Sequence, residues 1–241
     1  MNQDRLMVVA AHVGDLVWRC GGTVAKYAAA GLPVKVIILS YGLRGESTSL
    51  WKDPTRTWED AKQRRHAEAE AIVNALGVKE AEYWDLVDYP LSASQELTER
   101  LAGSVRAFAP TILLTHDRNR DVMNQDHGLA AELVWQASIL AGAAGFRDGQ
   151  APVSVTCMFG FEPHMPDMSG FQPDIYIDIT DVWNIKQQAM LCNETQKGII
   201  ENYVAKAQMR ANHFRRMGGR KTCQYAECFS RFYPAFADWL F

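Results

Sequence analysis

Two side chains that could bind a metal ion lie three residues apart, directly after the first apolar segment of the chain. Residues 6–11 read Leu-Met-Val-Val-Ala-Ala, and His12 and Asp15 follow at once. His127 lies much later, where a helix is expected to begin. Catalytic zinc typically takes three protein ligands of these types and leaves a fourth position to water or substrate. The set therefore predicts a zinc site, and iron or manganese also suits two histidines and a carboxylate.

Two further residues could transfer protons next to such a metal. Glu46 lies in a long loop, residues 42–58, and a carboxylate beside a metal and a water is suited to act as a general base. His164 follows the segment 159–163 at the end of another expected strand. A solvated loop charge and a turn-capping histidine are the alternative interpretations of these two residues.

Four arginines are candidates for binding substrate carboxylates, because the planar guanidinium group can donate two parallel hydrogen bonds to a carboxylate. They are Arg44, Arg65, Arg118 and Arg120.

The elements that must position these side chains alternate between strands and helices. The pattern predicts strands at 6–11, 34–40, 82–86, 111–116, 153–161 and 174–179, and helices at 16–30, 57–76, 94–108 and 128–141. A helical region follows from Trp183 up to an aromatic tail at 229–241. This order predicts a Rossmann-like three-layer α/β/α sandwich with a mostly parallel sheet, formed by residues 1–241 as one domain. Such sheets place their chemistry at the carboxyl ends of the strands, where His12 lies.

Composition narrows the function classes. The 241 residues are 48% hydrophobic and 22% charged, with a formal net charge of −3, which argues against a nucleic-acid binder or a membrane-surface binder. No apolar segment approaches the ~20 residues of a membrane span, and the N-terminus lacks the features of a secretory signal. The five cysteines include no CxxC pair. We therefore expect a cytoplasmic protein with reduced thiols. We also expect a homo-oligomer.

Two common classes of α/β enzyme are excluded by pattern. There is no GxGxxG after the first strand, only Gly21-Gly22 inside the following helix, which argues against a dinucleotide cofactor. There is also no GxSxG segment of the kind that carries the nucleophile of α/β-hydrolases.

The sequence resembles the PIG-L/LmbE-like zinc proteins, whose best-known members are N-deacetylases of N-acetylglucosaminyl compounds. Their first motif, Ala-His-Pro-Asp-Asp, corresponds to residues 11–15, and their later motif, His-Pro-Asp-His, corresponds to residues 124–127. The resemblance implies zinc ligation by His12, Asp15 and His127. It extends to Arg65 and Glu68, which form an Arg-x-x-Glu pattern on the second expected helix.

Two positions differ from these motifs, and both differences argue against the deacetylase reaction. The first aspartate of the deacetylase motif is the general base that activates water, and that position is Gly14 here. The first histidine of the later motif is Asn124. A positioned general base contributes typically ~10²–10⁴-fold to a rate, so a deacetylase lacking it is expected to be severely impaired.

A hydratase branch of the family departs in the same way, and the similarity to it extends along the chain. Matching segments include 11–22, 42–47, 88–91, 161–164, 178–183 and 224–227. The resemblance implies zinc-dependent addition of water to 4-oxalomesaconate, or to its enol 4-carboxy-2-hydroxymuconate, in the breakdown of aromatic acids such as gallate. We expect Glu46 and His164 to be catalytic, with base and acid not yet assigned, and the arginines, Asn124 and Tyr225 to bind a small polycarboxylate.

Two alternatives stay open at this point. One is a zinc-dependent N-deacetylase of an N-acetylated sugar derivative that has recruited Glu46 or another acid. The other is an inactive metal-binding or sugar-binding module. Gly14 and Asn124 argue against the first, and the retained ligand set together with Glu46 and His164 argues against the second.

Overall fold

The strand that carries His12 is an interior strand of a seven-stranded sheet. The computed structural model describes residues 4–119 and 121–235. Every residue of this strand is buried, as expected for a strand covered on both faces by helices. The sheet order is β3-β2-β1-β4-β5-β7-β6. The strands are β1 (Leu6–His12), β2 (Val34–Ser40), β3 (Glu80–Tyr83), β4 (Ile112–His116), β5 (Cys157–Phe161), β6 (Ile175–Asp178) and β7 (Ala226–Arg231).

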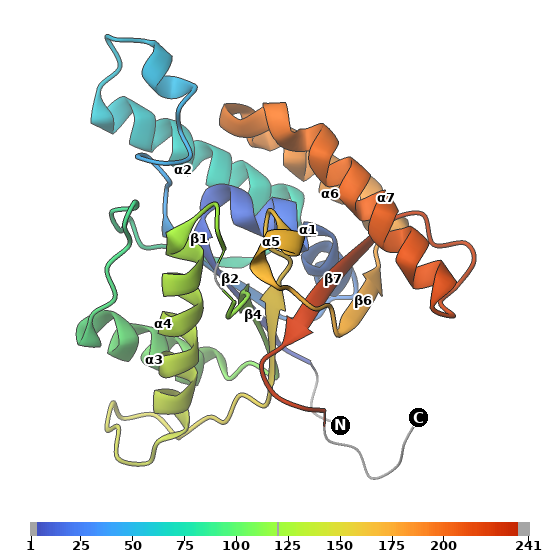
Figure 1. Ribbon diagram of the computed structural model, residues 1–241. Coiled ribbons are helices and arrows are strands. Elements are labelled where there is room, and N and C mark those ends of the chain that lie inside the picture. Colours follow the sequence, from blue (N-terminus) through green and yellow to red (C-terminus); the bar gives the residue numbers. More distant parts are fainter. Residues whose placement is uncertain (1–3, 120, 236–241) are drawn as a thin grey trace.

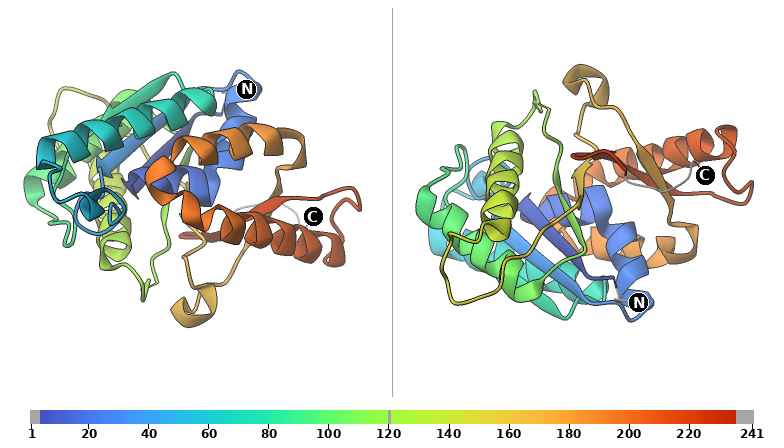
Figure 2. Two further views of the ribbon diagram at one scale, coloured as in Figure 1. Left: turned by 90° about the horizontal axis from the view of Figure 1, so that it is seen from above. Right: turned by 90° about the horizontal axis from the view of Figure 1, so that it is seen from below.

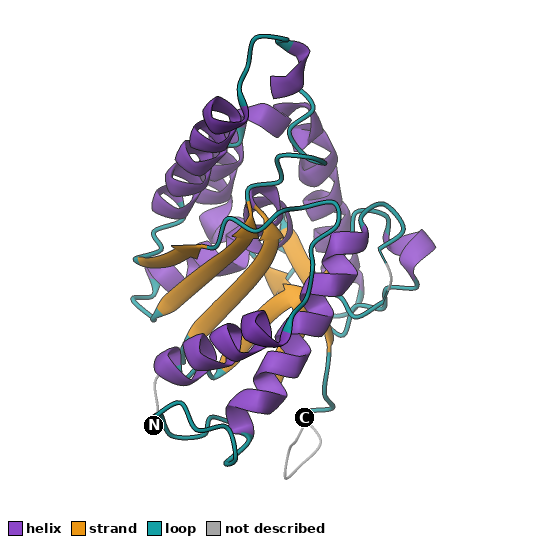
Figure 3. Ribbon diagram, turned by 90° about the vertical axis from the view of Figure 1, so that its left-hand side faces the viewer, coloured by secondary structure: helices purple, strands orange, loops and turns teal. Residues whose placement is uncertain are grey.

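Helices cover both faces of this sheet and make the three-layer arrangement (Figures 1 and 3). One apolar cluster joins the sheet to the helices α1, α2, α6 and α7, and a second joins it to α3 and α4. Helix α6, orange, lies beside α1, blue, in both views of Figure 2. The helices are α1 (Val13–Ala29), α2 (Trp58–Ala75), α3 (Gln95–Phe108), α4 (Gln125–Gly142), α5 (Pro166–Ser169), α6 (Trp183–Cys192) and α7 (Ile200–Arg216), with short 3-10 helices η1 (Leu50–Lys52), η2 (Thr180–Val182) and η3 (Glu194–Ile199).

The first five strands of the sheet order are parallel, so β1, β2, β4 and β5 end at the same edge. In the register of the sheet His12 pairs with Ser40, and His116 pairs with Phe161. The loops that follow these strands therefore converge above the carboxyl end of β1. The α/β class and the mostly parallel sheet that the sequence predicts are confirmed.

The far edge of the sheet differs from the prediction. Residues 226–231, expected to join a helical region to an aromatic tail, form β7, which pairs antiparallel with both β5 and β6. This strand was not predicted because it contains Glu227, and a charged residue interrupts the apolar pattern that is typical of a buried strand. The part of the predicted tail at 236–241 lies outside the described residues.

Two helices begin earlier than the pattern predicts. Helix α1 starts at Val13, three residues before Leu16, because the backbone N–H of His12 donates to the carboxylate of Asp15 at 2.9 Å and closes the first turn. Helix α4 starts at Gln125, where the side chain of Asn124 caps the first turn. Both segments that are predicted to bind the metal therefore lie at helix N-termini.

A few other boundaries also differ from the prediction. The strand predicted at 82–86 ends at Tyr83, and the strand predicted from 153 begins at Cys157.

None of the helices in the described residues is long and apolar enough to cross a membrane.

Buried ionic contacts attach β7 to the helix that carries Asp15. The carboxylate of Glu227 accepts hydrogen bonds from the backbone N–H groups of Gly22 and Thr23 at 2.8 and 2.7 Å, and from Lys186 Nζ at 2.6 Å. Both charged side chains are buried. This cluster joins α1, α6 and β7 at one point.

Removing one charge of this cluster is expected to destabilise the protein strongly. Lys186→Met leaves the Glu227 carboxylate buried without its counter-charge, which typically costs ~3–5 kcal/mol. The control is Asp181→Asn, which removes a partially exposed ion pair with Lys26 and is expected to change the free energy of unfolding by about 1 kcal/mol or less. Urea denaturation measures both variants, and equal effects would contradict this prediction.

Candidate metal centre and cavity

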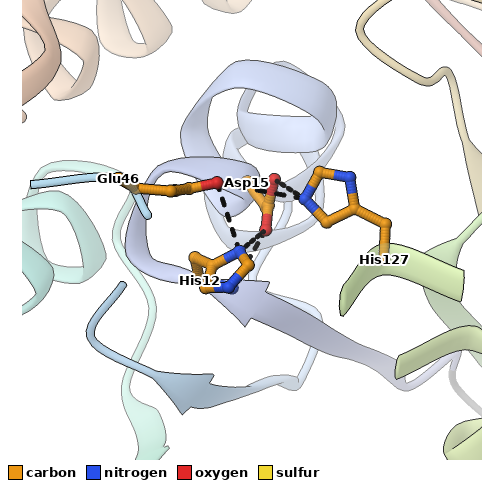
Figure 4. Close-up of side chains that lie close together, drawn as sticks. All are labelled: His12, Asp15, Glu46 and His127. Atoms are coloured by element: carbon orange, nitrogen blue, oxygen red, sulfur yellow. Dashed lines mark hydrogen bonds and ion pairs between the residues drawn. The ribbon is translucent and has the colours of Figure 1, made fainter. Parts of the chain in front are cut away.

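Four side chains converge at the carboxyl end of β1 (Figure 4). His12 ends β1, Asp15 lies in the first turn of α1, His127 lies in the first turn of α4, and Glu46 lies in the loop after β2. One ligand atom from each residue lies within 4.8 Å of those of the other three. His12 Nδ1 is 3.4 Å from Asp15 Oδ2 and 3.2 Å from Glu46 Oε1, and His127 Nε2 is 3.3 Å from Asp15 Oδ1.

The far nitrogen of each histidine is held by an aspartate. His12 Nε2 lies 3.2 Å from Asp126 Oδ2, and His127 Nδ1 lies 2.9 Å from Asp121 Oδ2. Asp126 is itself fixed, because its two carboxylate oxygens accept from the backbone N–H groups of Tyr89 and Leu91, each at 2.9 Å. Such carboxylate–histidine contacts set the tautomer and the ring orientation of metal-binding histidines.

The near nitrogens of the two histidines are the observation that supports metal binding. His12 Nδ1 and His127 Nε2 are buried and have no hydrogen-bond partner among the described residues. Both face the Asp15 carboxylate. A buried imidazole nitrogen without a hydrogen bond is costly, and a cation bound between these atoms would satisfy both nitrogens. The donor set of two imidazoles and carboxylate oxygens fits zinc.

Arg19 adds a buried positive charge that the sequence did not single out. It lies one turn after Asp15 on α1, and its Nε donates to Asp15 Oδ1 at 2.9 Å. Its Nη1 donates to the backbone oxygen of Glu162 at 2.7 Å. Burial raises the pKa of Asp15, but the charges of His127 and Arg19, together with the contact to His116, outweigh it and hold the pKa well below its ordinary value. Asp15 is therefore a carboxylate at neutral pH.

His116, at the end of β4, packs against the side chain of His127. Its ring stacks on that of His127 with the centroids 4.2 Å apart. Its Nε2 accepts a hydrogen bond from the backbone N–H of Ala11 at 3.0 Å. Burial, together with the charge of His127, lowers the pKa of His116 to about 3. A neutral ring in this place packs against His127 without adding another positive charge.

Glu46 is held in place by its loop. Asp88 accepts hydrogen bonds from the backbone N–H groups of Arg44 and Gly45, and Ser47 Oγ donates to the backbone oxygen of Gly42 at 2.8 Å. The carboxylate of Glu46 receives the Asn124 amide at 3.1 Å on Oε1. Burial raises the pKa of Glu46, but the positive charge of His12 outweighs it and lowers the pKa below its ordinary value.

A cavity of about 640 Å³ opens above the four side chains. Asp15, Glu46 and His127 line its floor, and it is also lined by His164, in the loop after β5, and by Tyr203 on α7. His164 Nδ1 lies 3.4 Å from the Tyr203 hydroxyl. Burial lowers the pKa of His164, and burial raises that of Tyr203 to about 12, so both groups are neutral at pH 7.

The structure brings some of the predicted substrate-binding residues to the cavity and not others. Asn124 lines it. The backbone of Arg44 holds the Glu46 loop, and its side chain reaches the backbone oxygen of Asp88 at 3.5 Å instead of the cavity. Arg65 is fully buried behind the cavity, where it donates to the backbone oxygen of Tyr41 and to Glu68.

Arg118 and Tyr225 also lie away from this cavity. Arg118 lines a separate cavity next to Phe232. Tyr225 stacks on Trp183 with the ring centroids 3.9 Å apart, on the side of the sheet that α6 covers. Arg120 lies outside the described residues. Among the described residues that line the cavity, the cationic side chains are Arg19 and Lys197.

Comparison with known proteins decides the family. Residues 7–138 match PIG-L, described as GlcNAc-PI de-N-acetylase. The chain belongs to the PIG-L family. It is also 36% identical over 235 residues, 96% of its length and 90% of the relative's, to a protein of Pseudomonas putida described as 4-oxalmesaconate hydratase. A diacetylchitobiose deacetylase of Thermococcus kodakarensis is 25% identical over 80% of this chain and 70% of its own length.

Solved PIG-L structures agree with the fold. The crystal structure of GalB from Pseudomonas putida, described as the 4-carboxy-2-hydroxymuconate hydratase, superimposes with a TM-score of 0.93 at 35% identity and covers 98% of this chain and 99% of its own. An N,N'-diacetylchitobiose deacetylase from Pyrococcus horikoshii superimposes with a TM-score of 0.80 at 20% identity, covering 96% and 84%, and supports the fold alone. The resemblance to PIG-L and LmbE-like proteins that the sequence predicts is confirmed.

The two departures from the PIG-L deacetylase motifs lie at the N-termini of α1 and α4. Gly14 is in the first turn of α1, between His12 and Asp15. Asn124, at the position of the motif's first histidine, caps α4 and donates to Glu46. At this site a second carboxylate beside that of Asp15, from Glu46 in the loop after β2, lies next to His12.

Proposed function

We propose that this PIG-L protein is a zinc-dependent hydratase, a hydro-lyase of aromatic acid catabolism. Its substrate would be 4-oxalomesaconate, or the enol 4-carboxy-2-hydroxymuconate, and its product 4-carboxy-4-hydroxy-2-oxoadipate. The observation that carries this proposal is the similarity over almost the whole chain to two proteins described as hydratases of these compounds. In this proposal the enzyme works in the cytoplasm as a homo-oligomer.

In this proposal His12, Asp15 and His127 hold the metal. Their buried nitrogens and the Asp15 carboxylate supply the donor set described above. Zinc bound there would act as a Lewis acid that stabilises negative charge on the substrate oxygen conjugated to the double bond.

Glu46 and His164 would move the two protons of the addition. Oε1 of Glu46 lies 3.2 Å from His12 Nδ1, and in this proposal it takes a proton from the attacking water. His164, across the cavity, would deliver a proton to carbon. A Tyr203 hydroxyl that donates to Nδ1 would leave the ring proton of His164 on Nε2, the nitrogen that would act as the acid.

The polycarboxylate substrate would meet a small number of positive groups. Arg19 is already bonded to Asp15 and to the Glu162 backbone. Lys197 at the cavity rim and the Asn124 amide are the groups of this chain best placed to meet substrate carboxylates, together with the metal. Arg44, Arg65, Arg118 and Tyr225 have no part in this binding scheme.

A comparison of two substrates tests the proposal. Zinc-loaded protein is incubated separately with 4-oxalomesaconate and with N,N'-diacetylchitobiose. We expect loss of the conjugated absorbance of the first compound and no release of acetate from the second. Acetate release without loss of absorbance would favour the deacetylase function that the family description suggests.

A further inference from the structure

The space beside Gly14 is filled by a side chain from a distant part of the chain. A Cβ atom added to Gly14 would lie 2.3 Å from Gln196 Oε1, 2.6 Å from Trp18 Nε1 and 3.0 Å from Asn193 Nδ2. Real Cβ atoms essentially never show contacts under 3.0 Å. Gln196 can thus take this position only because residue 14 has no side chain.

The hydrogen bonds of Gln196 fix which way its amide points. Oε1 accepts from Asn193 Nδ2 at 2.9 Å and from Trp18 Nε1 at 3.4 Å. Because both neighbours are donors, the amide oxygen must face them and the NH₂ group must face the other way. That NH₂ group donates to Glu46 Oε2 at 3.3 Å.

Both oxygens of Glu46 are therefore held by side-chain amides. Asn124 Nδ2 binds Oε1 at 3.1 Å, and Gln196 Nε2 binds Oε2. A glutamate side chain in a loop otherwise has several rotamers, and two fixed donors select one of them. With Oε2 bonded to Gln196, Oε1 is the oxygen that faces the histidines.

The support of Gln196 extends to a buried arginine. Arg65 Nη1 donates to Asn193 Oδ1 at 2.6 Å, and the same nitrogen donates to Glu68 Oε2 at 2.6 Å. Asn193 and Arg65 are both fully buried. Gln196 itself departs from the helical backbone of η3, with φ −120° and ψ 20°. Rigid contacts from α2 through Asn193 thus fix the oxygen end of the Gln196 amide.

We propose that Gln196 is a positioning residue that uses the open space at Gly14 to hold the Glu46 carboxylate in the orientation that accepts a proton. This inference rests on the proposed hydratase function. Gln196 acts through Glu46 and takes no part in bond making. The role of Gln196 therefore depends on the glycine at position 14, although the two residues are 182 positions apart in the sequence.

Gln196→Glu separates positioning from space filling. The variant keeps the shape of the side chain and the oxygen that faces Asn193 and Trp18, but it replaces the donor to Glu46 by a second carboxylate oxygen. We expect kcat to fall ~10-fold or more, with a smaller change in KM and with unchanged zinc content. The control is Gln187→Glu, the same substitution at an exposed position of α6, where kcat is expected to stay within twofold. Unchanged kcat in Gln196→Glu would overturn the proposal.

Gly14→Ala tests whether Gln196 depends on the open space beside residue 14. The added methyl group would lie under 3.0 Å from both the Gln196 amide and the Trp18 indole, so the amide must move and kcat is expected to fall in a similar way. In the Gln196→Ala background the same substitution is expected to cause a smaller further loss, because the amide is already absent and the Trp18 ring can shift into its space. Independent losses in the two backgrounds would contradict the proposal.

A crystal structure of zinc-loaded Gln196→Glu gives a readout that does not depend on turnover. We expect the Glu46 carboxylate to rotate away from His12 and His127. Glu46 in an unchanged position would overturn the proposal. If the unsubstituted chain fails to hydrate the substrate but Glu46 rotates in the variant, the proposed hydratase function fails while the positioning by Gln196 holds.

Discussion

Glu46→Gln is expected to lower turnover ~100-fold or more while the protein keeps its zinc. Glutamine preserves the shape of the side chain and can still accept the Asn124 amide, which now binds the Glu46 Oε1 atom at 3.1 Å. It cannot take a proton from water. The loss should therefore fall on kcat and leave KM almost unchanged, and steady-state kinetics with metal analysis of the same preparation measures both.

The zinc content of this variant distinguishes two roles for the carboxylate. Glu46 Oε1 lies within reach of the same metal position as His12, Asp15 and His127. If Glu46 transfers a proton, the glutamine variant binds zinc and is inactive. Loss of zinc together with activity would instead identify Glu46 as a ligand, and near-normal turnover would remove it from the mechanism.

His127→Ala is expected to abolish both zinc binding and turnover. The substitution removes Nε2, one of the two buried nitrogens that face Asp15, and leaves Asp121 without the hydrogen bond to the ring. Treatment of the unsubstituted protein with a strong chelator should have the same effect on turnover, and added zinc should restore the chelated protein but not the variant.

Thermal unfolding gives an independent measure of the same site. Zinc at ~1,000 times its Kd stabilises a folded protein by about 4 kcal/mol. For a chain of this length, that corresponds to a rise in Tm of roughly 8–16 °C. The rise is expected in the unsubstituted protein and in the control variant His213→Ala, whose histidine lies on α7 outside the cavity, and is absent from His127→Ala. Full activity in metal-free protein would contradict the metal site.

The convergence of the proposed metal ligands could be predicted because it depends on local rules. A buried parallel strand that ends in His12 and a helix that begins near His127 both point to the same edge of the sheet. The spacing of His12 and Asp15 reflects a closed helical turn. The sequence therefore indicates which side chains meet, although it does not supply the distances between them.

The directions of the arginines could not be predicted, because they depend on partners far along the chain. Arg65 turns away from the cavity to a site prepared by Glu68, the Tyr41 backbone and Asn193. Arg19 was missed although it lies one turn after Asp15, since only the folded chain shows that this helix face is buried against Glu162.

Two other features depend on long-range contacts in the same way. Strand β7 is stabilised by a buried ion pair between Glu227 and Lys186, which no local pattern shows. The absence of a side chain at Gly14 is visible in the sequence, but the amide that fills the space comes from residue 196. A glycine at such a position can indicate that another group packs close to the backbone, but the sequence does not show which residue that is.

Identification of the product by ¹³C NMR shows directly whether the enzyme adds water to a carbon–carbon double bond in the cavity above His12. Zinc-loaded protein is incubated with 4-oxalomesaconate, next to the same preparation treated with chelator. We expect the olefinic signals to disappear with zinc and a saturated carbon bearing a hydroxyl group to appear, as in 4-carboxy-4-hydroxy-2-oxoadipate. Olefinic signals that persist in the zinc-loaded sample, at the same level as in the chelated one, would contradict the proposed hydration.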